Sequence, residues 1–279
     1  MIAFVTMPVT HDSLRRKIYR ARSAPKDRQF VTALARGLRI LRCFSHDQPE
    51  LTPNEIVRMT GLPQPTVWRL CHTLQEDGFI ICPGDGRKMA LGIPVLALGY
   101  ATLARQPLPQ IALPYMRALT ERYRLGTSLA VRDGLEMTYL QRTHGDFTYF
   151  NDPVGARRPI ATAPTGWACM ATYNQTELTA LYKALKRQHG KNWPAIQRNI
   201  QRGLADYRAH GFVLSVGILH KEFNAVAVPI RRTDTGTVHG LSASGLASIW
   251  PRARLLAIGS ELIALARDLA TVSVPEHLT

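Results

Sequence analysis

The alternation of apolar and polar residues is clearest between Leu51 and Gly78. Thr52 is placed as a helix N-cap, Pro53 suits the first helical position, and Glu55 is spaced to close a capping box. Gly61 follows two turns later and ends the helix, because glycine adopts positive φ at little cost. This pattern predicts one short helix that stops at a tight turn.

A second helix is predicted to begin at Gln64, with apolar residues at i, i+3, i+4 and i+7: Val67, Leu70, Cys71 and Leu74. The opposite face carries polar groups and a tryptophan, with no carboxylate before Glu76: Gln64, Thr66, Trp68, Arg69, His72 and Thr73. Two short helices joined by such a turn form a helix-turn-helix, whose second helix fits the DNA major groove. A helical hairpin inside a core has the same periodicity, but the carboxylate-free face favours DNA binding. We therefore predict that these six residues contact DNA, with Arg69 on guanine or phosphate.

The residues after this helix predict a β-hairpin. Residues 79–81 and 89–91 are apolar and flank a turn at residues 83–86. Arg87 and Lys88 follow the turn, where the tip of a hairpin meets a phosphate backbone. Together with the preceding helices, the hairpin predicts a winged helix-turn-helix over residues 29–92.

Two further helices are predicted around this unit. The first covers residues 31–45, and its expected buried stripe is Val31, Leu34, Leu38, Leu41 and Phe44. The second falls within residues 93–106 and is apolar on more than one side, which is typical of a linker helix that packs against a partner subunit. Prolines at 107 and 109 mark the boundary to a second domain over residues 107–279.

The second domain alternates helical and strand patterns. Helices are predicted over residues 109–123, 174–190, 196–211 and 252–270, and strands over 128–132, 135–142, 212–216, 225–230 and 238–244. Asp133 and Gly134 form a hairpin turn between the first two strands. These elements predict an antiparallel sheet flanked by helices, so the chain as a whole belongs to the α+β class.

Charge and cysteine content narrow the classes of function. The 279 residues carry a formal net charge of +15, which favours polyanionic partners. The excess is spread over the chain, +7 in residues 1–105 and +8 beyond, so it supports nucleic-acid binding only weakly. Residues 13–28 hold seven basic side chains, and we assign residues 1–28 as a basic arm, either a solvated tail or a segment that lies along DNA.

The four cysteines form no CxxC pair, which indicates core thiols in a reducing compartment, with no zinc site and no disulfide. No apolar run has the length of a membrane span, and the N-terminus lacks the pattern of a signal peptide. We expect a cytoplasmic protein without a cofactor or a metal.

Several motifs resemble those of the IclR-type bacterial transcription regulators, in order and spacing, over nearly the whole chain from Val31. They are Arg36-Gly37-Leu38-x-Ile40-Leu41, Gly61-Leu62-Pro63-x-Pro65-Thr66-Val67-x-Arg69-Leu70, Thr73-Leu74-x-x-x-Gly78-Phe79, Leu91-Gly92, Gly155-x-x-x-Pro159, Thr162-x-x-x-Gly166-x-Ala168, Gly211-Phe212, Ala227-x-Pro229 and Ser242-x-Ser244-Gly245. The resemblance implies a winged helix-turn-helix on operator DNA and a GAF-like domain that binds a small-molecule effector. It also implies a homodimer or a dimer of dimers, hence a pseudo-palindromic operator.

The resemblance also locates an effector site. Family members that bind small 2-oxo acids use an acidic residue, a cysteine and two serines, which correspond here to Ser215, Ala225, Ser242 and Ser244. Two further positions, a histidine and a lysine, are Ala161 and Trp167 here. These changes imply a larger and less polar ligand, such as an aromatic carboxylate. The predicted effector-binding residues are Arg157, Ala161, Thr162, Thr165, Ser215, Ala225, Ser242 and Ser244.

Arg157 and Arg142 are alternative charge partners for such a carboxylate, and a solvated surface charge is at least as good an interpretation of each. The function expected is a regulator of genes for uptake or catabolism of a small organic acid. The alternative is a hydrolase or acyl-transfer enzyme with a nucleic-acid-binding module, because residues 240–244 half resemble a nucleophile elbow around Ser242. An RNA-binding module is a further alternative from the basic surface.

Overall fold

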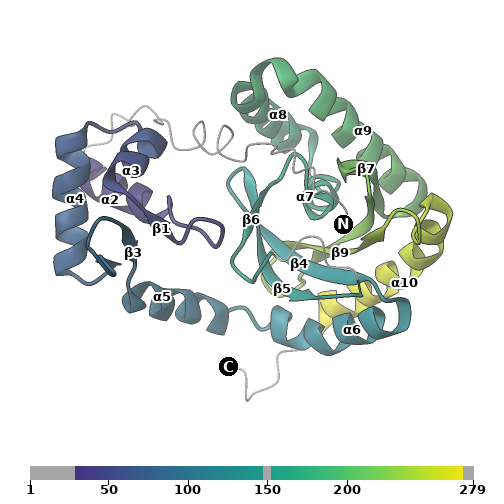
Figure 1. Ribbon diagram of the computed structural model, residues 1–279. Helices are drawn as coiled ribbons and strands as arrows, with labels where there is room; N and C mark the ends of the chain where they lie inside the picture. Colours follow the sequence, from purple (N-terminus) through teal and green to yellow (C-terminus); the bar gives the residue numbers. More distant parts are fainter. Residues whose placement is uncertain (1–28, 147–151, 273–279) are drawn as a thin grey trace, which may run out of the picture. The chain divides into compact units, whose positions relative to one another are not determined.

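The computed structural model describes residues 29–146 and 152–272, so the predicted basic arm lies outside the described residues. The chain divides into two compact units, Met1–Thr102 and Leu103–Thr279 (Figure 1). The first contains α2 (Thr32–Leu41), β1 (Glu50–Leu51), α3 (Pro53–Thr60), α4 (Gln64–Glu76), β2 (Ile80–Ile81) and β3 (Met89–Leu91), and α5 (Ile93–Ala104) follows.

The helix-turn-helix forms as its capping signals predict. Thr52 Oγ1 accepts a hydrogen bond from the Glu55 amide at 3.3 Å, and the Glu55 carboxylate accepts one from the Thr52 amide at 2.8 Å. Gly61 ends α3 with φ of 67°. Strand β3 pairs with β2 on one side and with β1 on the other, and this short β1 was not predicted. The capping box and the wing are therefore confirmed.

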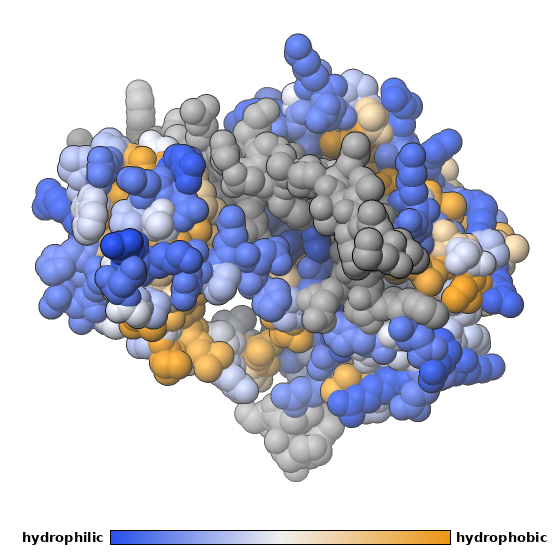
Figure 2. Space-filling model, viewed as in Figure 1, coloured by the Kyte–Doolittle hydropathy of each residue, from blue (hydrophilic) through white to orange (hydrophobic). Residues whose placement is uncertain are grey.

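The predicted buried stripe of the first helix is confirmed at Leu41 and Phe44, which pack in the core, and is wrong for its other three residues. Val31, Leu34 and Leu38 are 61%, 62% and 54% exposed, whereas Ile40 and Cys43 on the other side are buried against α3 and α4 residues. Apolar residues lie on both sides of α2, so periodicity alone does not tell which side meets the chain's own core. Helix α5 has no buried residue, and its apolar side chains form an orange surface in Figure 2.

The second unit is a six-stranded antiparallel sheet with helices on both faces. Its elements are α6 (Leu108–Tyr123), β4 (Gly126–Asp133), β5 (Glu136–Thr143), β6 (Arg157–Pro159), α7 (Pro164–Met170), α8 (Gln175–His189), α9 (Trp193–His210), β7 (Val213–His220), β8 (Phe223–Arg231), β9 (Val238–Leu246) and α10 (Arg252–Thr271). The strand order is β6-β5-β4-β9-β8-β7. Helices α6 and α10 cover one face, called here the α10 face, and α7 covers the other, the α7 face (Figure 1).

Glycine allows α7 to lie directly on the sheet. A Cβ on Gly240 of β9 would stand 2.4 Å from the backbone oxygen of Thr165, so any side chain there would push the helix away. Trp167 is fully buried on the other side of α7, and its indole nitrogen donates to the Ala161 carbonyl at 2.8 Å. A Cβ on Gly203 of α9 would stand 2.7 Å from this indole. Helix α7 is thus held tightly between β9 and α9.

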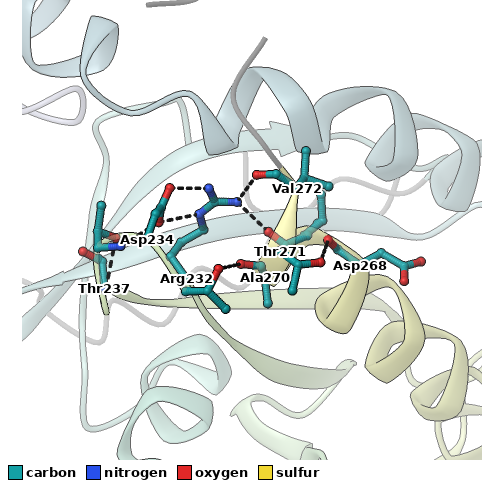
Figure 3. A network of polar contacts seen from close by, with 10 residues as sticks. Arg232, Asp234, Thr237, Asp268, Ala270, Thr271 and Val272 are labelled. Carbon is teal, nitrogen blue, oxygen red and sulfur yellow. Dashed lines mark hydrogen bonds and ion pairs between the residues drawn. The ribbon is translucent and has the colours of Figure 1, made fainter.

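One arginine ties the end of α10 to the turn between β8 and β9 (Figure 3). Arg232 Nη1 donates to the carbonyls of Leu269 and Val272, at 2.9 Å each, and the rest of its guanidinium binds the Asp234 carboxylate. A cation at a helix C-terminus is favoured by the helix dipole and satisfies carbonyls that lack a helical partner. This pairing holds the pKa of Asp234 at about 2.

Candidate DNA interface and effector site

Helix α4 presents the predicted DNA-binding residues to solvent. Val67 and Cys71 anchor its other side in the core, where burial raises the pKa of the Cys71 thiol to about 11. Five of the six are exposed and Thr66 is half-buried, with Trp68 the most apolar at 51% exposure. The Arg69 guanidinium makes no hydrogen bond or ion pair with the described part of the chain, so it is free to bind a phosphate or a base.

The wing residues already have partners. Arg87 Nε lies 3.3 Å from the Asp85 carboxylate, and Lys88 Nζ lies 3.4 Å from that of Glu50. All four side chains are well exposed, and such pairs contribute little to stability. Both cations can therefore exchange a carboxylate for a DNA phosphate.

In the second unit, register brings the predicted serines onto one surface. Ser215, Ala225 and Ser244 are neighbours across β7, β8 and β9. Ser242 lies in the next row, opposite Ala227 of β8 and Ser128 of β4. Since side chains alternate along a strand, these residues share the α7 face with Gly240. The side chains of this surface are small, unlike those on the α10 face.

Several polar groups between the sheet and α7 lack partners. The Thr165 hydroxyl is buried without a hydrogen bond. The hydroxyls of Ser128, Ser215 and Ser242 also make none with the residues described; these residues are largely buried, but of the four hydroxyl oxygens only that of Thr165 is fully enclosed. Polar groups that lie together on one surface without partners in the protein are typical of a ligand site. The remaining predicted residues are engaged locally, since Thr162 bonds to the Pro159 carbonyl and Ala161 accepts from Trp167.

The two candidate arginines lie on opposite faces. Arg157 pairs with Thr138, which lies between two α7-face residues of β5, and so points to the α10 face. There it contacts the carboxylates of Glu136 and Asp133. Arg142 is directly opposite Ser128 and shares the α7 face. The structure thus brings Arg142, and not Arg157, together with the serines.

Ser242 does not have the setting of a catalytic nucleophile. A nucleophile elbow places its serine on a sharp turn between a strand and a helix. Ser242 instead lies in the middle of β9, and the nearby His239 points to the opposite face of the sheet. The partial match to the elbow motif is therefore part of an ordinary strand and does not mark a nucleophilic serine.

A winged helix-turn-helix followed by an α+β domain with a group of polar residues between its sheet and α7 is the architecture of a DNA-binding regulator with its own sensor domain. The model of the IclR helix-turn-helix domain matches residues 33–80, and that of the bacterial transcriptional regulator IclR C-terminal domain matches residues 100–271. The chain belongs to the IclR family of bacterial transcriptional regulators. This confirms the resemblance drawn from the motifs.

Relatives match over most of the chain. The HTH-type transcriptional regulator TsaQ1/TsaQ2 of Comamonas testosteroni is 29% identical, over 79% of this chain and 80% of that protein. The Pca regulon regulatory protein of Pseudomonas putida is 26% identical, over 68% and 74%. The crystal structure of an IclR family regulator from Brucella abortus has a TM-score of 0.79 at 36% identity, covering 88% and 93%. Each match thus covers more than two thirds of both proteins.

Within residues 29–146 and 152–272, none of the helices combines the length and apolar character needed to cross a bilayer.

Proposed function

We propose that this protein controls genes for uptake or catabolism of a small organic acid, an aromatic carboxylate, by binding operator DNA in response to that acid. The observation that carries the proposal is the cluster of unpartnered polar groups on the α7 face, in a chain whose other unit is a DNA-binding domain. An IclR homologue from Microbacterium hydrocarbonoxydans, crystallised with 4-hydroxybenzoate, has a TM-score of 0.68 at 24% identity. That likeness supports the ability of the fold to hold an aromatic acid.

On DNA, α4 enters the major groove with Gln64, Thr66, Trp68, Arg69, His72 and Thr73 toward the bases, and Arg87 and Lys88 bind the backbone. The exposed apolar sides of α2 and α5 support a homodimer, or a dimer of dimers, on a pseudo-palindromic site. The effector binds between α7 and the sheet, on the surface that carries Thr165, Ser215, Ala225, Ser242 and Ser244. An effector that favours one arrangement of the dimer changes operator affinity by roughly 1–3 kcal/mol, reciprocally.

The DNA part is tested with duplexes from around the protein's own gene, by fluorescence anisotropy at several salt concentrations. Arg69→Ala is expected to weaken binding by about tenfold or more, because it removes a base or phosphate contact. Arg202→Ala, which removes one exposed positive charge from α9, is the matched control and keeps the wild-type affinity. Equal affinities for both variants would remove α4 from the interface.

The competing functions are tested with the same protein. An RNA-binding module predicts equal binding of single-stranded RNA and no palindromic footprint on DNA. An acyl-transfer enzyme predicts turnover of aryl esters that Ser242→Ala abolishes. A response of operator affinity to benzoate-type acids, without ester turnover, supports the regulator.

A further inference from the structure

Two arginines share one aspartate on the α7 face, at the β5–β6 end of the sheet. Arg158 Nε and Nη2 bind the two carboxylate oxygens of Asp152, at 2.8 and 2.6 Å. Arg142 Nη1 lies 3.4 Å from one of these oxygens and donates to the Asp152 carbonyl at 2.9 Å. The Arg142 side chain is 9% exposed and stacks over the Tyr139 ring, with its guanidinium carbon 4.8 Å from the ring centre. Asp152 and Tyr139 therefore hold Arg142 in one orientation.

The charge of Arg142 is only partly neutralised by this arrangement. The fork of Arg158 already occupies both oxygens of the carboxylate, so Arg142 has a single longer contact with it. Its Nε is buried and makes no hydrogen bond with the residues described. A buried guanidinium with a free donor is costly unless an anion completes its coordination. The part of the Arg142 side chain that stays exposed, 9%, is where an anion on the α7 face would reach it.

Neighbouring hydroxyls extend this anion site across the sheet. Arg142 lies opposite Ser128, and Ser128 lies opposite Ser242, on three adjacent strands. Strands are about 4.8 Å apart, so the row from Arg142 to Ser242 spans roughly 10 Å, which suits one aromatic ring with a carboxylate. Ser215 on β7 is four strand spacings from β5, roughly 19 Å, and lies beyond the reach of such a ligand.

We infer that Arg142 binds the carboxylate of a one-ring aromatic monocarboxylate, whose ring lies over Ser128 and Ser242. This inference rests on the proposed function and narrows it, because it moves the ligand to the β4–β5 side of the sheet and away from Ser215. Asp152 acts as a positioning residue that orients the guanidinium. A neutral analogue of the same shape lacks the group that Arg142 recognises.

The test is a thermal-shift titration of the full chain with benzoate and 4-hydroxybenzoate, with benzamide as the neutral match and inorganic phosphate as a second anion. The acids are expected to raise the melting temperature, and benzamide and phosphate are not. Arg142→Met should weaken binding of the acids by at least about tenfold, since it removes a charge-assisted hydrogen bond. Ser128→Ala and Ser242→Ala should each weaken it a few-fold.

Arg157→Met is the competing arm, because it removes an arginine that contacts two carboxylates on the opposite face of the same sheet. The inference is overturned if Arg142→Met retains the response, if Arg157→Met or Ser215→Ala abolishes it instead, or if neither acid shifts the wild type. A phosphate response lost in Arg142→Met would also overturn the choice of a carboxylate. Arg142→Lys, which keeps the charge without the fork, is expected to bind with intermediate affinity and serves if the methionine variant does not fold.

Operator binding separates this inference from the function on which it rests. Folded Arg142→Met should bind operator DNA like the wild type and no longer respond to benzoate. Absence of operator binding in the wild type would contradict the proposed function itself, whatever the thermal shifts show.

Discussion

The two faces of the six-stranded sheet are made by alternate residues of the same strands, yet the residues of β9 differ between them in size and polarity. On the α10 face, Leu241 and Ala243 of β9 join a core of large aliphatic side chains from β8 and α10. On the α7 face, β9 carries the small residues Gly240, Ser242 and Ser244, and the Thr165 hydroxyl of α7 is buried without a hydrogen bond. The contrast teaches that packing on one face allows the other to keep polar groups available for a ligand.

The largest effect is expected from truncation on the α10 face. Leu241→Ala removes a fully buried side chain and leaves a cavity, so it should lower the free energy of unfolding by about 2–5 kcal/mol. Ser242→Ala, one residue along, should change it by less than about 1 kcal/mol, because it deletes a hydroxyl without a partner. Urea denaturation of both variants measures the difference. Equal losses would mean that both faces are packed for stability.

A smaller effect is expected from acid. His239 is buried on the α10 face between Ile230 and Val131, and burial, reinforced by the Arg232 cation, lowers the pKa of its imidazole to about 4. An unfolded histidine has a pKa of about 6.5, so between these values the unfolded state binds the extra proton. Stability is therefore lost as the pH falls from about 6.5 to about 4, by at most about 3 kcal/mol.

His239→Leu removes this titration, and other groups titrate alike in both proteins. The urea midpoints of the two proteins, measured from pH 7 to pH 4.5, should diverge, with the wild type losing more. Parallel curves would show that His239 takes up its proton in the folded state as readily as in the unfolded one.

The smallest effect on stability is expected from a substitution on the α7 face. Thr165→Val replaces a buried, unpartnered hydroxyl by a methyl group of similar volume. Stability without ligand should stay the same or rise by up to about 1 kcal/mol, because no hydrogen bond is lost. Calorimetric melting of the variant measures this. A loss larger than 1 kcal/mol would show that the hydroxyl supports the fold.

Much of the fold was predictable because its signals are local. Thr52 caps α3 as predicted, and Asn174 and Gly211 mark the start of α8 and the end of α9 in the same local way. The strands of the second unit also alternate strongly enough to be located within a few residues. Their order in the sheet follows from contacts between distant segments, which a periodic pattern does not encode.

Other elements carry no such signal. Strand β6 has three residues, and α7 has seven, all buried, so neither shows a polar side from which a period can be read. The sequence pattern also did not show which side of α2 packs against the core of the first unit, since both sides are apolar. In the candidate site, the sequence offered two arginines, and only the register of β5 and β6 separates them.

The placement of two tryptophans gives the protein its own optical reporters. Trp68 stands on the open side of α4, where bound DNA would shield its indole from a dissolved quencher. Trp167 is enclosed between α7 and α9, near the surface assigned to the effector, and a quencher in solution cannot reach it. Since the other three tryptophans of the chain are buried, the part of the emission that a quencher reaches comes mainly from Trp68 and can follow binding at the proposed DNA interface without an attached dye.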